Sequence, residues 1–199
     1  MDLKHHGSLR ERKKARTRAA IREHALRLFG EQGYQATTVE QIAAAAEVSP
    51  STFFRYFPTK EDVVLRDDFD ERVVDAFERQ PPTMTPLAAL RAAIREAVAT
   101  LSPAEWEEFR QTTALGATVP EIRARTLDEL SRTIDVMAGA LAKRTGRSAD
   151  DLAVRTYVGA IFGVMMSILS PGDWAADIGK QTFKRIDEAL ALLESGLPL

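Results

Sequence analysis

The spacing of hydrophobic and polar residues predicts an all-helical protein. Apolar residues recur at intervals of three and four along most of the chain, and no sustained alternation of apolar and polar residues indicates a strand. Residues 10–32 form the first predicted helix, with Ile21 and Phe29 on its apolar stripe. Gly33 then supplies a stop, because glycine readily takes the left-handed conformation that ends helices.

Capping residues predict two short helices after this stop. Thr37 with Glu40 three positions later offers a hydroxyl cap and a carboxylate, so a helix is expected from there to about position 45. Ser49 followed by Pro50 combines a cap with a first-turn proline. A third helix is therefore expected to end near Phe57.

Further caps and prolines divide the rest of the chain. Thr59 predicts a fourth helix that runs to about Arg79, and Pro81–Pro82 form the clearest linker. The helices expected beyond the linker cover residues 86–101, 103–116, 120–144, 149–169 and 174–194. The fold class is thus all-α, with about nine helices.

The segment from Thr37 to Lys60 predicts a helix-turn-helix unit. Its two short helices are separated by a tight turn at residues 46–48, which is the spacing of this motif. The residues expected to pack inward are Val39, Ile42, Ala43, Val48, Phe53 and Phe57. The opposite face of the second helix carries Ser51, Thr52, Arg55 and Tyr56. These polar and aromatic side chains suit contacts with base edges and phosphates.

Charge is distributed unevenly along the chain. Residues 1–60 contain 11 Lys and Arg against 6 Asp and Glu, whereas residues 61–199 contain 16 against 23. A basic cluster near the start of the first helix comprises Arg10, Arg12, Lys13, Lys14, Arg16 and Arg18. Such a cluster alone is also compatible with an ordinary solvated face. Beside a helix-turn-helix we interpret it as a surface for DNA phosphates.

Composition excludes several classes of protein. The chain has no cysteine, which excludes a disulfide framework, a thiolate metal site and a cysteine nucleophile. No metal site is expected from His5–His6 and His24, and no glycine-flanked nucleophile turn or phosphate-binding loop suggests an enzyme. The N-terminus lacks the apolar stretch of a signal peptide, and no run reaches the roughly 20 apolar residues that span a bilayer. A cytoplasmic protein is expected.

An ordered set of motifs between residues 16 and 65 carries a family resemblance. Phe29 and Gly33–Tyr34 are followed by TTVEQIA, then by VSPSTFFRYF and TKEDV. In this order and spacing they resemble the N-terminal domain of TetR-type regulators. The resemblance implies a DNA-binding domain at 1–65 and a ligand-binding and dimerisation domain at 66–199. It further implies a homodimeric repressor that leaves a near-palindromic operator when a small hydrophobic effector binds, with no cofactor.

The resemblance also assigns DNA contacts. Thr38, Ser49 and Lys60 fall where the family contacts phosphates, and Arg16 belongs to the basic cluster before them. The residues that fall on the groove-facing side of the recognition helix are Ser51, Thr52, Phe54, Arg55 and Tyr56. Two positions depart from the family pattern. Phe54 replaces the common tyrosine and so lacks a hydroxyl, and Glu47 replaces the common turn glycine.

Ligand contacts are expected from the C-terminal part, which resembles a subgroup that binds acyl or other hydrophobic ligands. Trp106, Phe109, Met137 and Phe162 are the candidates, because they fall on helices that usually enclose the cavity in this family. Each is also compatible with plain core packing. Arg110 is a candidate partner for a ligand carboxylate or phosphate, and a surface ion pair is its alternative.

Dimerisation is expected through the last two helices. Gly159 and Gly163 lie four residues apart and permit close helix approach. Two other classes of function remain as alternatives. A carrier of hydrophobic ligands that no longer binds DNA would need a damaged recognition face. A helical enzyme for a lipid-like substrate would need an acid–base pair in the C-terminal part, where the sequence has no histidine.

Overall fold

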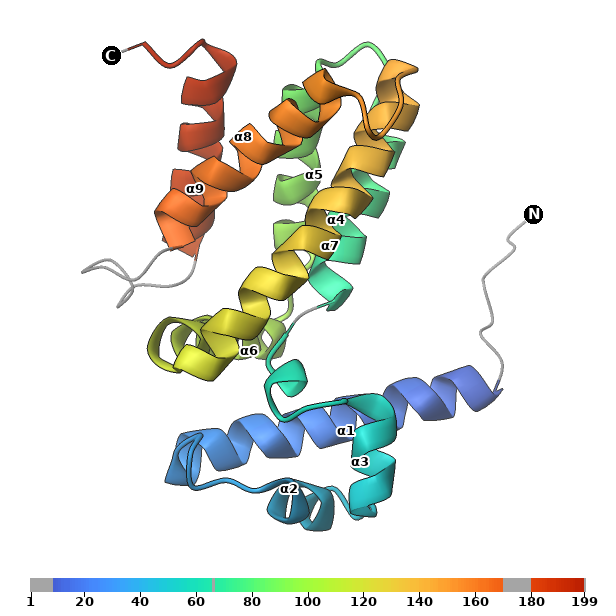
Figure 1. The fold of residues 1–199 in the computed structure, drawn as a ribbon, viewed down its shortest axis with the longest axis vertical. Coiled ribbons are helices and arrows are strands. Elements are labelled where there is room, and N and C mark those ends of the chain that lie inside the picture. Colours follow the sequence, from blue (N-terminus) through green and yellow to red (C-terminus); the bar gives the residue numbers. More distant parts are fainter. Residues whose placement is uncertain (1–8, 66, 170–179, 199) are drawn as a thin grey trace. The chain divides into compact units, whose positions relative to one another are not determined.

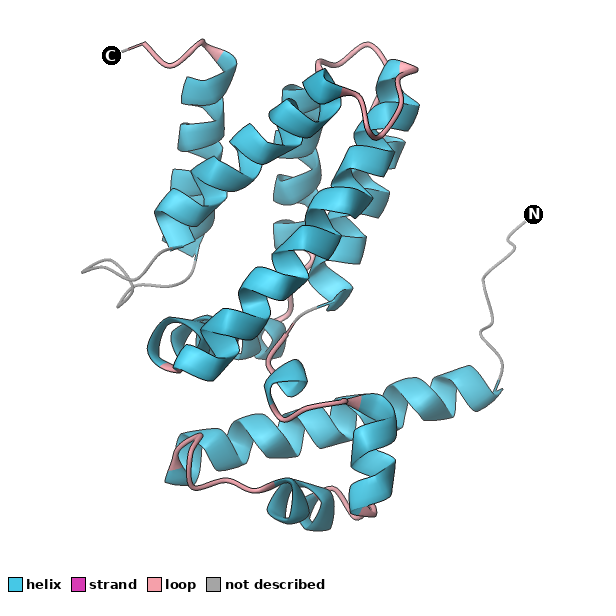
Figure 2. Cartoon of the chain, viewed as in Figure 1, coloured by secondary structure: helices cyan, strands magenta, loops and turns pink. Residues whose placement is uncertain are grey.

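The structure is a computed structural model that describes residues 9–65, 67–169 and 180–198. These residues form nine α-helices and one 3-10 turn, with no strand among them, so the all-helical prediction is confirmed (Figure 2). Contacts between Cα atoms divide the chain into two compact units, Met1–Leu65 and Arg66–Leu199. Each unit has its own core of buried side chains.

The first unit contains three helices and the 3-10 turn: α1 (Leu9–Gln32), α2 (Val39–Ala45), α3 (Pro50–Tyr56) and η1 (Glu61–Val63). Both α2 and η1 pack on α1, and α3 packs on α2 (Figure 1). The side chains that are almost fully buried here include Ile21, Ala25, Phe29, Ile42, Phe53, Phe57 and Val63. Gly33 ends α1 with a φ of 86°, and its N–H donates to Phe29 O at 3.1 Å. The helix stop expected at Gly33 is confirmed.

The long helix expected from Thr59 to Arg79 is wrong. Thr59 exchanges two hydrogen bonds with Asp62 of η1 instead: Asp62 N donates to Thr59 Oγ1 at 3.3 Å and Thr59 N donates to Asp62 Oδ2 at 2.9 Å. The Arg22 guanidinium of α1 donates to Leu65 O at 2.5 Å and to Val64 O at 3.4 Å. Because a continuing helix would use these carbonyls itself, α-helical structure resumes only at Asp67.

The second unit is built from six helices: α4 (Asp67–Arg79), α5 (Pro86–Ala99), α6 (Pro103–Thr118), α7 (Pro120–Thr145), α8 (Leu152–Leu169) and α9 (Lys180–Glu194). Helix α5 packs against α4 and α9, α7 contacts α4, α6 and α8, and α8 contacts α9 (Figure 1). The core between them includes Phe77, Leu90, Ala93, Ile94, Val154, Val158, Phe162, Ile186 and Leu190. One continuous cluster of apolar side chains therefore joins these helices.

Local caps define the starts of α5, α6 and α8. Thr85 and Ser102 accept hydrogen bonds from Ala88 N and Glu105 N at 3.2 and 3.3 Å, and a proline follows each cap, as predicted. Helix α8 begins three residues later than the predicted residue 149, because the Asp151 carboxylate accepts from Ala153 N at 2.8 Å. The expected start of the last helix near Trp174 lies outside the described residues.

Arg144 of α7 holds the C-terminal end of α4 and the loop that follows it. Its guanidinium donates to Gln80 O and Met84 O at 3.1 Å each, and also to Pro81 O. The same group lies 5.4 Å from the centre of the Phe77 ring. Backbone carbonyls left over at a helix end are thus satisfied by a side chain from another helix.

Glu105 gives this unit a defined acid dependence. Its carboxylate accepts from Ser102 N at 2.9 Å, from Ser102 Oγ at 2.7 Å and from Arg72 Nη2 of α4 at 2.5 Å. These bonds lower the pKa of Glu105 from 4.5 to about 2, the bond to Ser102 N contributing most. The stabilisation is therefore complete above pH 4.5 and is lost as the pH falls through about 2.

We expect the Glu105→Gln variant to be less stable than the wild type at neutral pH. The amide can still cap α6, but it cannot form the ion pair with Arg72. The two proteins should converge in free energy of unfolding as the pH falls from 4.5 to about 2. Urea unfolding at several pH values measures this difference, with Glu71→Gln on the exposed face of α4 as control. A difference that does not depend on pH would contradict the assignment.

Candidate DNA-binding surface and ligand cavity

The cap of α2 lies one residue later than the sequence analysis expected. Thr38 Oγ1 accepts from Gln41 N at 3.2 Å, and Gln41 Oε1 accepts from Thr38 N at 2.9 Å. The expected pair of Thr37 and Glu40 is wrong because Thr37 is buried, and its hydroxyl donates to Gly33 O at 2.8 Å. Thr38 itself is exposed at the start of α2.

The turn between α2 and α3 is a Schellman motif centred on a left-handed residue. Glu47 has a φ of 53°. Val48 N donates to Ala43 O at 2.9 Å, and Glu47 N donates to Ala44 O at 3.1 Å, which is the bonding pattern of this motif. The predicted tight turn is therefore present, with a side chain where glycine fits best.

Replacement of Glu47 by glycine should stabilise the first unit. We expect Glu47→Gly to exceed Glu47→Ala by about 1 kcal/mol in free energy of unfolding, because alanine keeps the Cβ that strains a left-handed residue. Urea unfolding of the full chain measures the difference. Equal stability of the two variants would show that the turn carries no strain at this position.

Helix α3 presents one buried face and one exposed face. Ser49 caps it by accepting from Thr52 N at 3.1 Å, and Pro50 begins it. Phe53 and Phe57 are buried on the inner face. The residues predicted to read DNA that lie on the outer side are Ser51, Phe54 and Arg55, which are exposed, and Thr52 and Tyr56, which are half-buried.

The aromatic residues of α3 position its exposed side chains. The Arg55 guanidinium lies 5.3 Å from the centre of the Tyr56 ring, and the Phe54 ring packs edge-on at 5.5 Å from that of Phe53. Phe54 still exposes 50% of its surface. Such an apolar group, at a position predicted to read DNA, suits a thymine methyl.

The basic cluster lies on the same unit as α3. Arg16 and the neighbouring cations at positions 10, 12, 13 and 14 are exposed along α1. Arg18 is half-buried, and its guanidinium lies 5.1 Å from the centre of the Phe57 ring at the end of α3. This contact places Arg18, the last residue of the basic cluster, at the end of α3.

The side chain of Lys60 forms hydrogen bonds with the loop between α1 and α2. Its ammonium donates to Tyr34 O at 3.0 Å and to Thr37 O at 2.9 Å, and lies 4.0 Å from the centre of the Tyr34 ring. The Tyr34 hydroxyl donates to the Glu61 carboxylate. Burial raises the pKa of Glu61, but this bond and others outweigh it, so that the pKa is lowered overall. Sequence reasoning assigned Lys60 to a phosphate and missed this internal role.

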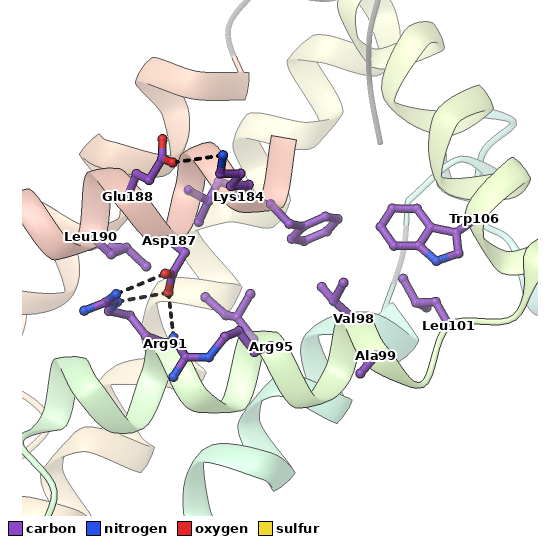
Figure 3. A pocket seen from close by; sticks show the side chains of 13 residues that line it. Arg91, Arg95, Val98, Ala99, Leu101, Trp106, Lys184, Asp187, Glu188 and Leu190 are labelled. Carbon is purple, nitrogen blue, oxygen red and sulfur yellow. Dashed lines mark hydrogen bonds and ion pairs between the residues drawn. The ribbon is translucent and has the colours of Figure 1, made fainter. Parts of the chain in front are cut away.

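A cavity of about 540 Å³ lies between α5 and α9, with Trp106 of α6 at one side (Figure 3). Its apolar lining consists of Ile94, Val98, Ala99, Leu101, Trp106, Phe183, Ile186 and Leu190. Its charged lining consists of Arg91, Arg95, Lys184, Asp187 and Glu188. This size and mixture are typical of sites for small molecules.

The charged end of the cavity is organised around Asp187. Arg91 Nε and Nη2 donate to its two carboxylate oxygens at 3.0 Å each, and Arg95 Nη1 donates to Oδ1 at 3.1 Å (Figure 3). The bonds from Arg91 contribute most to lowering the pKa of Asp187. Arg91 Nη1 also donates to Glu194 at 3.0 Å. Two arginines of α5 thus pair with acidic residues of α9.

The five residues predicted to bind a ligand are spread over different places. Trp106 lines the cavity, and its ring packs against those of Phe109 and Phe183 at centroid distances of 6.1 and 5.6 Å. Arg110 is exposed and pairs with Glu107. Met137 and Phe162 are buried in the core of the unit. Phe109 belongs to the aromatic cluster beside the cavity rather than to its lining.

Sequence reasoning missed the charged end of this cavity. Arg91 and Asp187 are 96 positions apart, so no local pattern joins them. The weak signal was the spacing of Arg91 and Arg95, which puts two cations on one face of α5.

The part of the chain that the structure describes contains neither a metal-binding cluster nor a membrane-spanning helix. No three His, Asp or Glu side chains there gather into a group that would hold a metal ion. His5–His6 lie outside the described residues. Among the described helices, none combines the length and apolar character needed to cross a bilayer.

The first unit has the architecture of a DNA-binding protein of the helix-turn-helix class, because α2, its turn and the exposed face of α3 lie on a basic first helix. Residues 21–66 match the family model of bacterial regulatory proteins, tetR family, and residues 84–198 match that of the MftR C-terminal domain. The chain therefore belongs to the TetR family of DNA-binding transcriptional regulators, which confirms the resemblance seen in its motifs.

Individual relatives agree with this assignment. The HTH-type transcriptional regulator TcmR of Streptomyces glaucescens is 37% identical over 81% of this chain and 75% of its own. The crystal structure of Thermus thermophilus FadR, a TetR-family repressor in complex with lauroyl-CoA, is 25% identical, with a TM-score of 0.57 over 92% of this chain and 95% of that one. The structure of FadR of Bacillus halodurans shares the fold. It is 24% identical, with a TM-score of 0.55 over 91% of this chain and 96% of that one. The relatives are regulators rather than enzymes.

Proposed function

We propose that this chain is a homodimeric repressor that binds a near-palindromic operator and leaves it when a small hydrophobic ligand binds. The observation that carries the proposal is the outer face of α3. Ser51, Phe54 and Arg55 are exposed there, while Phe53 and Phe57 hold the helix to the core. A helix that is packed on the core through one face and exposed on the other suits insertion into the major groove of DNA.

Helices α8 and α9 are the proposed dimer interface. Small residues at positions 159, 160, 163 and 167 form an exposed face on α8, and Leu152 exposes 81% of its surface at the start of that helix. Leu192 of α9 is also exposed. A second copy packed on these helices would bury them in a four-helix interface and present two recognition helices to DNA.

The cavity of the second unit supports a small-molecule effector. Its volume of about 540 Å³ lies in the range of small-molecule sites. FadR of Thermus thermophilus, whose fold this chain shares, is a repressor that was crystallised with lauroyl-CoA. Ligand and operator would oppose each other reciprocally, by roughly 1–3 kcal/mol. A DNA-binding regulator of this kind would act in the cytoplasm.

Selection from a randomised pool of double-stranded DNA, repeated across a series of salt concentrations, tests the proposal. A recovered near-palindrome whose affinity falls steeply with salt would support a dimeric operator-binding protein. Failure to enrich any sequence with folded, dimeric protein would refute it and favour a ligand carrier.

The same selection can be repeated with the Arg55→Ala variant. We expect a loss of preference at one base position of each half-site, worth about 1–3 kcal/mol if Arg55 contacts a base edge. Arg27→Ala is the matched control, because Arg27 is also exposed in this unit but pairs with Glu31 on α1. Equal preference in both variants would contradict a base-reading role for Arg55.

A further inference from the structure

We propose that the effector is an organic acid whose apolar body fills the cavity between α5 and α9 and whose anionic group binds Arg95. This inference rests on the proposed function, because it names the chemistry and place of the ligand that the repressor senses. It also moves the ligand site from the helices α6–α8, where the sequence analysis placed it, to a site formed mainly by α5 and α9.

The apolar part of the cavity favours a flat hydrophobic body. Trp106 and Phe183 meet nearly at right angles, with an interplanar angle of 83°, at one side of the cavity. Aliphatic side chains of both helices, including Ile94 and Leu190, form the remaining walls. Rings favour edge-to-face and offset contacts with other rings, so an aromatic ligand would gain more here than an aliphatic chain of equal size.

The polar end of the cavity favours an anion. Each of the three nitrogens of the Arg91 guanidinium already donates to a carboxylate, two of them to Asp187 and one to Glu194. Arg95 Nη1 donates at 3.1 Å to Asp187 Oδ1, an oxygen that Arg91 already binds, and the Arg95 side chain is 58% exposed. A guanidinium has five N–H donors in a planar fork, so Arg95 retains donors for a carboxylate or sulfonate.

A cationic ligand is disfavoured by the same geometry. The carboxylate of Asp187 is already shared by two guanidinium groups. The other carboxylate of the lining, that of Glu188, lies 3.7 Å from the ammonium of Lys184, so it too already has a cation beside it. A neutral ligand would fit the apolar walls but would leave the free donors of Arg95 in water, with no gain from them.

Two fluorescent probes with the same hydrophobic body test this chemistry. 8-Anilinonaphthalene-1-sulfonate carries a sulfonate, and N-phenyl-1-naphthylamine lacks it. We expect the wild-type protein to bind the sulfonate about tenfold more tightly, the ratio expected from one charge-assisted hydrogen bond. In Arg95→Gln this ratio should fall to about one, because only the sulfonate probe loses a contact. Arg132→Gln, which removes an exposed arginine of α7 that does not line the cavity, is the matched control.

A filling substitution tests the location independently of the charge. Ala99 is exposed on α5 and lines the cavity, so Ala99→Phe should occupy its space without disturbing the core. Binding of both probes should weaken at least tenfold in this variant, while the helical circular dichroism stays unchanged. Unchanged binding of both probes in Ala99→Phe would overturn the location. Equal binding of the two probes to the wild type, or an unchanged ratio in Arg95→Gln, would overturn the anionic ligand.

Operator binding, measured on the same preparations, separates this inference from the proposed function. If both probe results hold but a bound probe does not weaken operator binding, the acid site stands and ligand-induced release fails. If the operator binds as proposed but neither probe depends on Ala99 or Arg95, the regulator stands and this site is wrong.

Discussion

The Phe53→Ala variant should lose about 3–5 kcal/mol of the free energy of unfolding of the first unit, and with it DNA binding. Phe53 is completely buried. The centre of its ring lies 5.5 Å from that of Phe54 and 5.9 Å from that of Phe57. Removal of the ring leaves a cavity under the recognition helix. A unit of about 65 residues has roughly 3–10 kcal/mol of stability in total, so the loss takes most of it.

The neighbouring variant Phe54→Ala is the control for this prediction. Phe54 is half exposed, so its removal should change the free energy of unfolding by about 0.5 kcal/mol or less. The two variants together separate folding from recognition: Phe54→Ala should weaken operator binding in a stably folded protein. Urea unfolding followed by circular dichroism, together with DNA titration, measures both effects. Equal stability of the two variants would contradict the described packing of α3.

The second large effect is expected at Lys60, where Lys60→Met should cost about 2 kcal/mol of folding stability. The methionine can fill the same space, but it leaves Tyr34 O and Thr37 O without the donor that now lies 3.0 and 2.9 Å away. The cation over the Tyr34 ring is lost as well. The loop that leads into the Thr38 cap should therefore loosen.

The salt dependence of DNA binding distinguishes this internal role from a phosphate contact. If Lys60 bound a phosphate, Lys60→Met would lower the slope of log affinity against log salt by about one. We expect the slope to stay unchanged at temperatures where the variant is folded. Lys14→Met, in the exposed basic cluster of α1, provides the comparison and should lower the slope. A reduced slope with unchanged stability in Lys60→Met would refute the internal role.

The sequence predicted the elements whose signals are local. Ser49–Pro50 and Ser102–Pro103 start helices because a hydroxyl cap and a first-turn proline act within one turn of the chain. The motifs of the first unit likewise identified the family, since the order of its caps and aromatic residues is contained in a short segment.

The errors arose where a distant group decides the local structure. Arg22 binds the carbonyls of Val64 and Leu65, and this contact across more than 40 positions ends the helix that Thr59 alone would favour. Thr37 does not cap α2 because packing buries it, and its hydroxyl donates to Gly33 O four residues away. The ion pair of Arg91 with Asp187 is equally non-local. Sequence spacing reports none of these contacts, because each depends on how the helices pack.

Arg144 binds three backbone carbonyls at the C-terminal end of α4, so a rigid-body motion of this helix would pivot about that end. Its C-terminal end is held through backbone groups and by the ion pairs of Glu78 and Arg79, whereas its N-terminal half contacts other helices through the ion pair of Arg72 and the ring of Phe69. A helix of 13 residues is about 20 Å long, so a pivot of about 5° at Arg144 moves the far end by roughly 2 Å. Phe69 packs on Phe183 of the cavity wall, with 5.7 Å between the ring centres, in the half of α4 that such a pivot would displace.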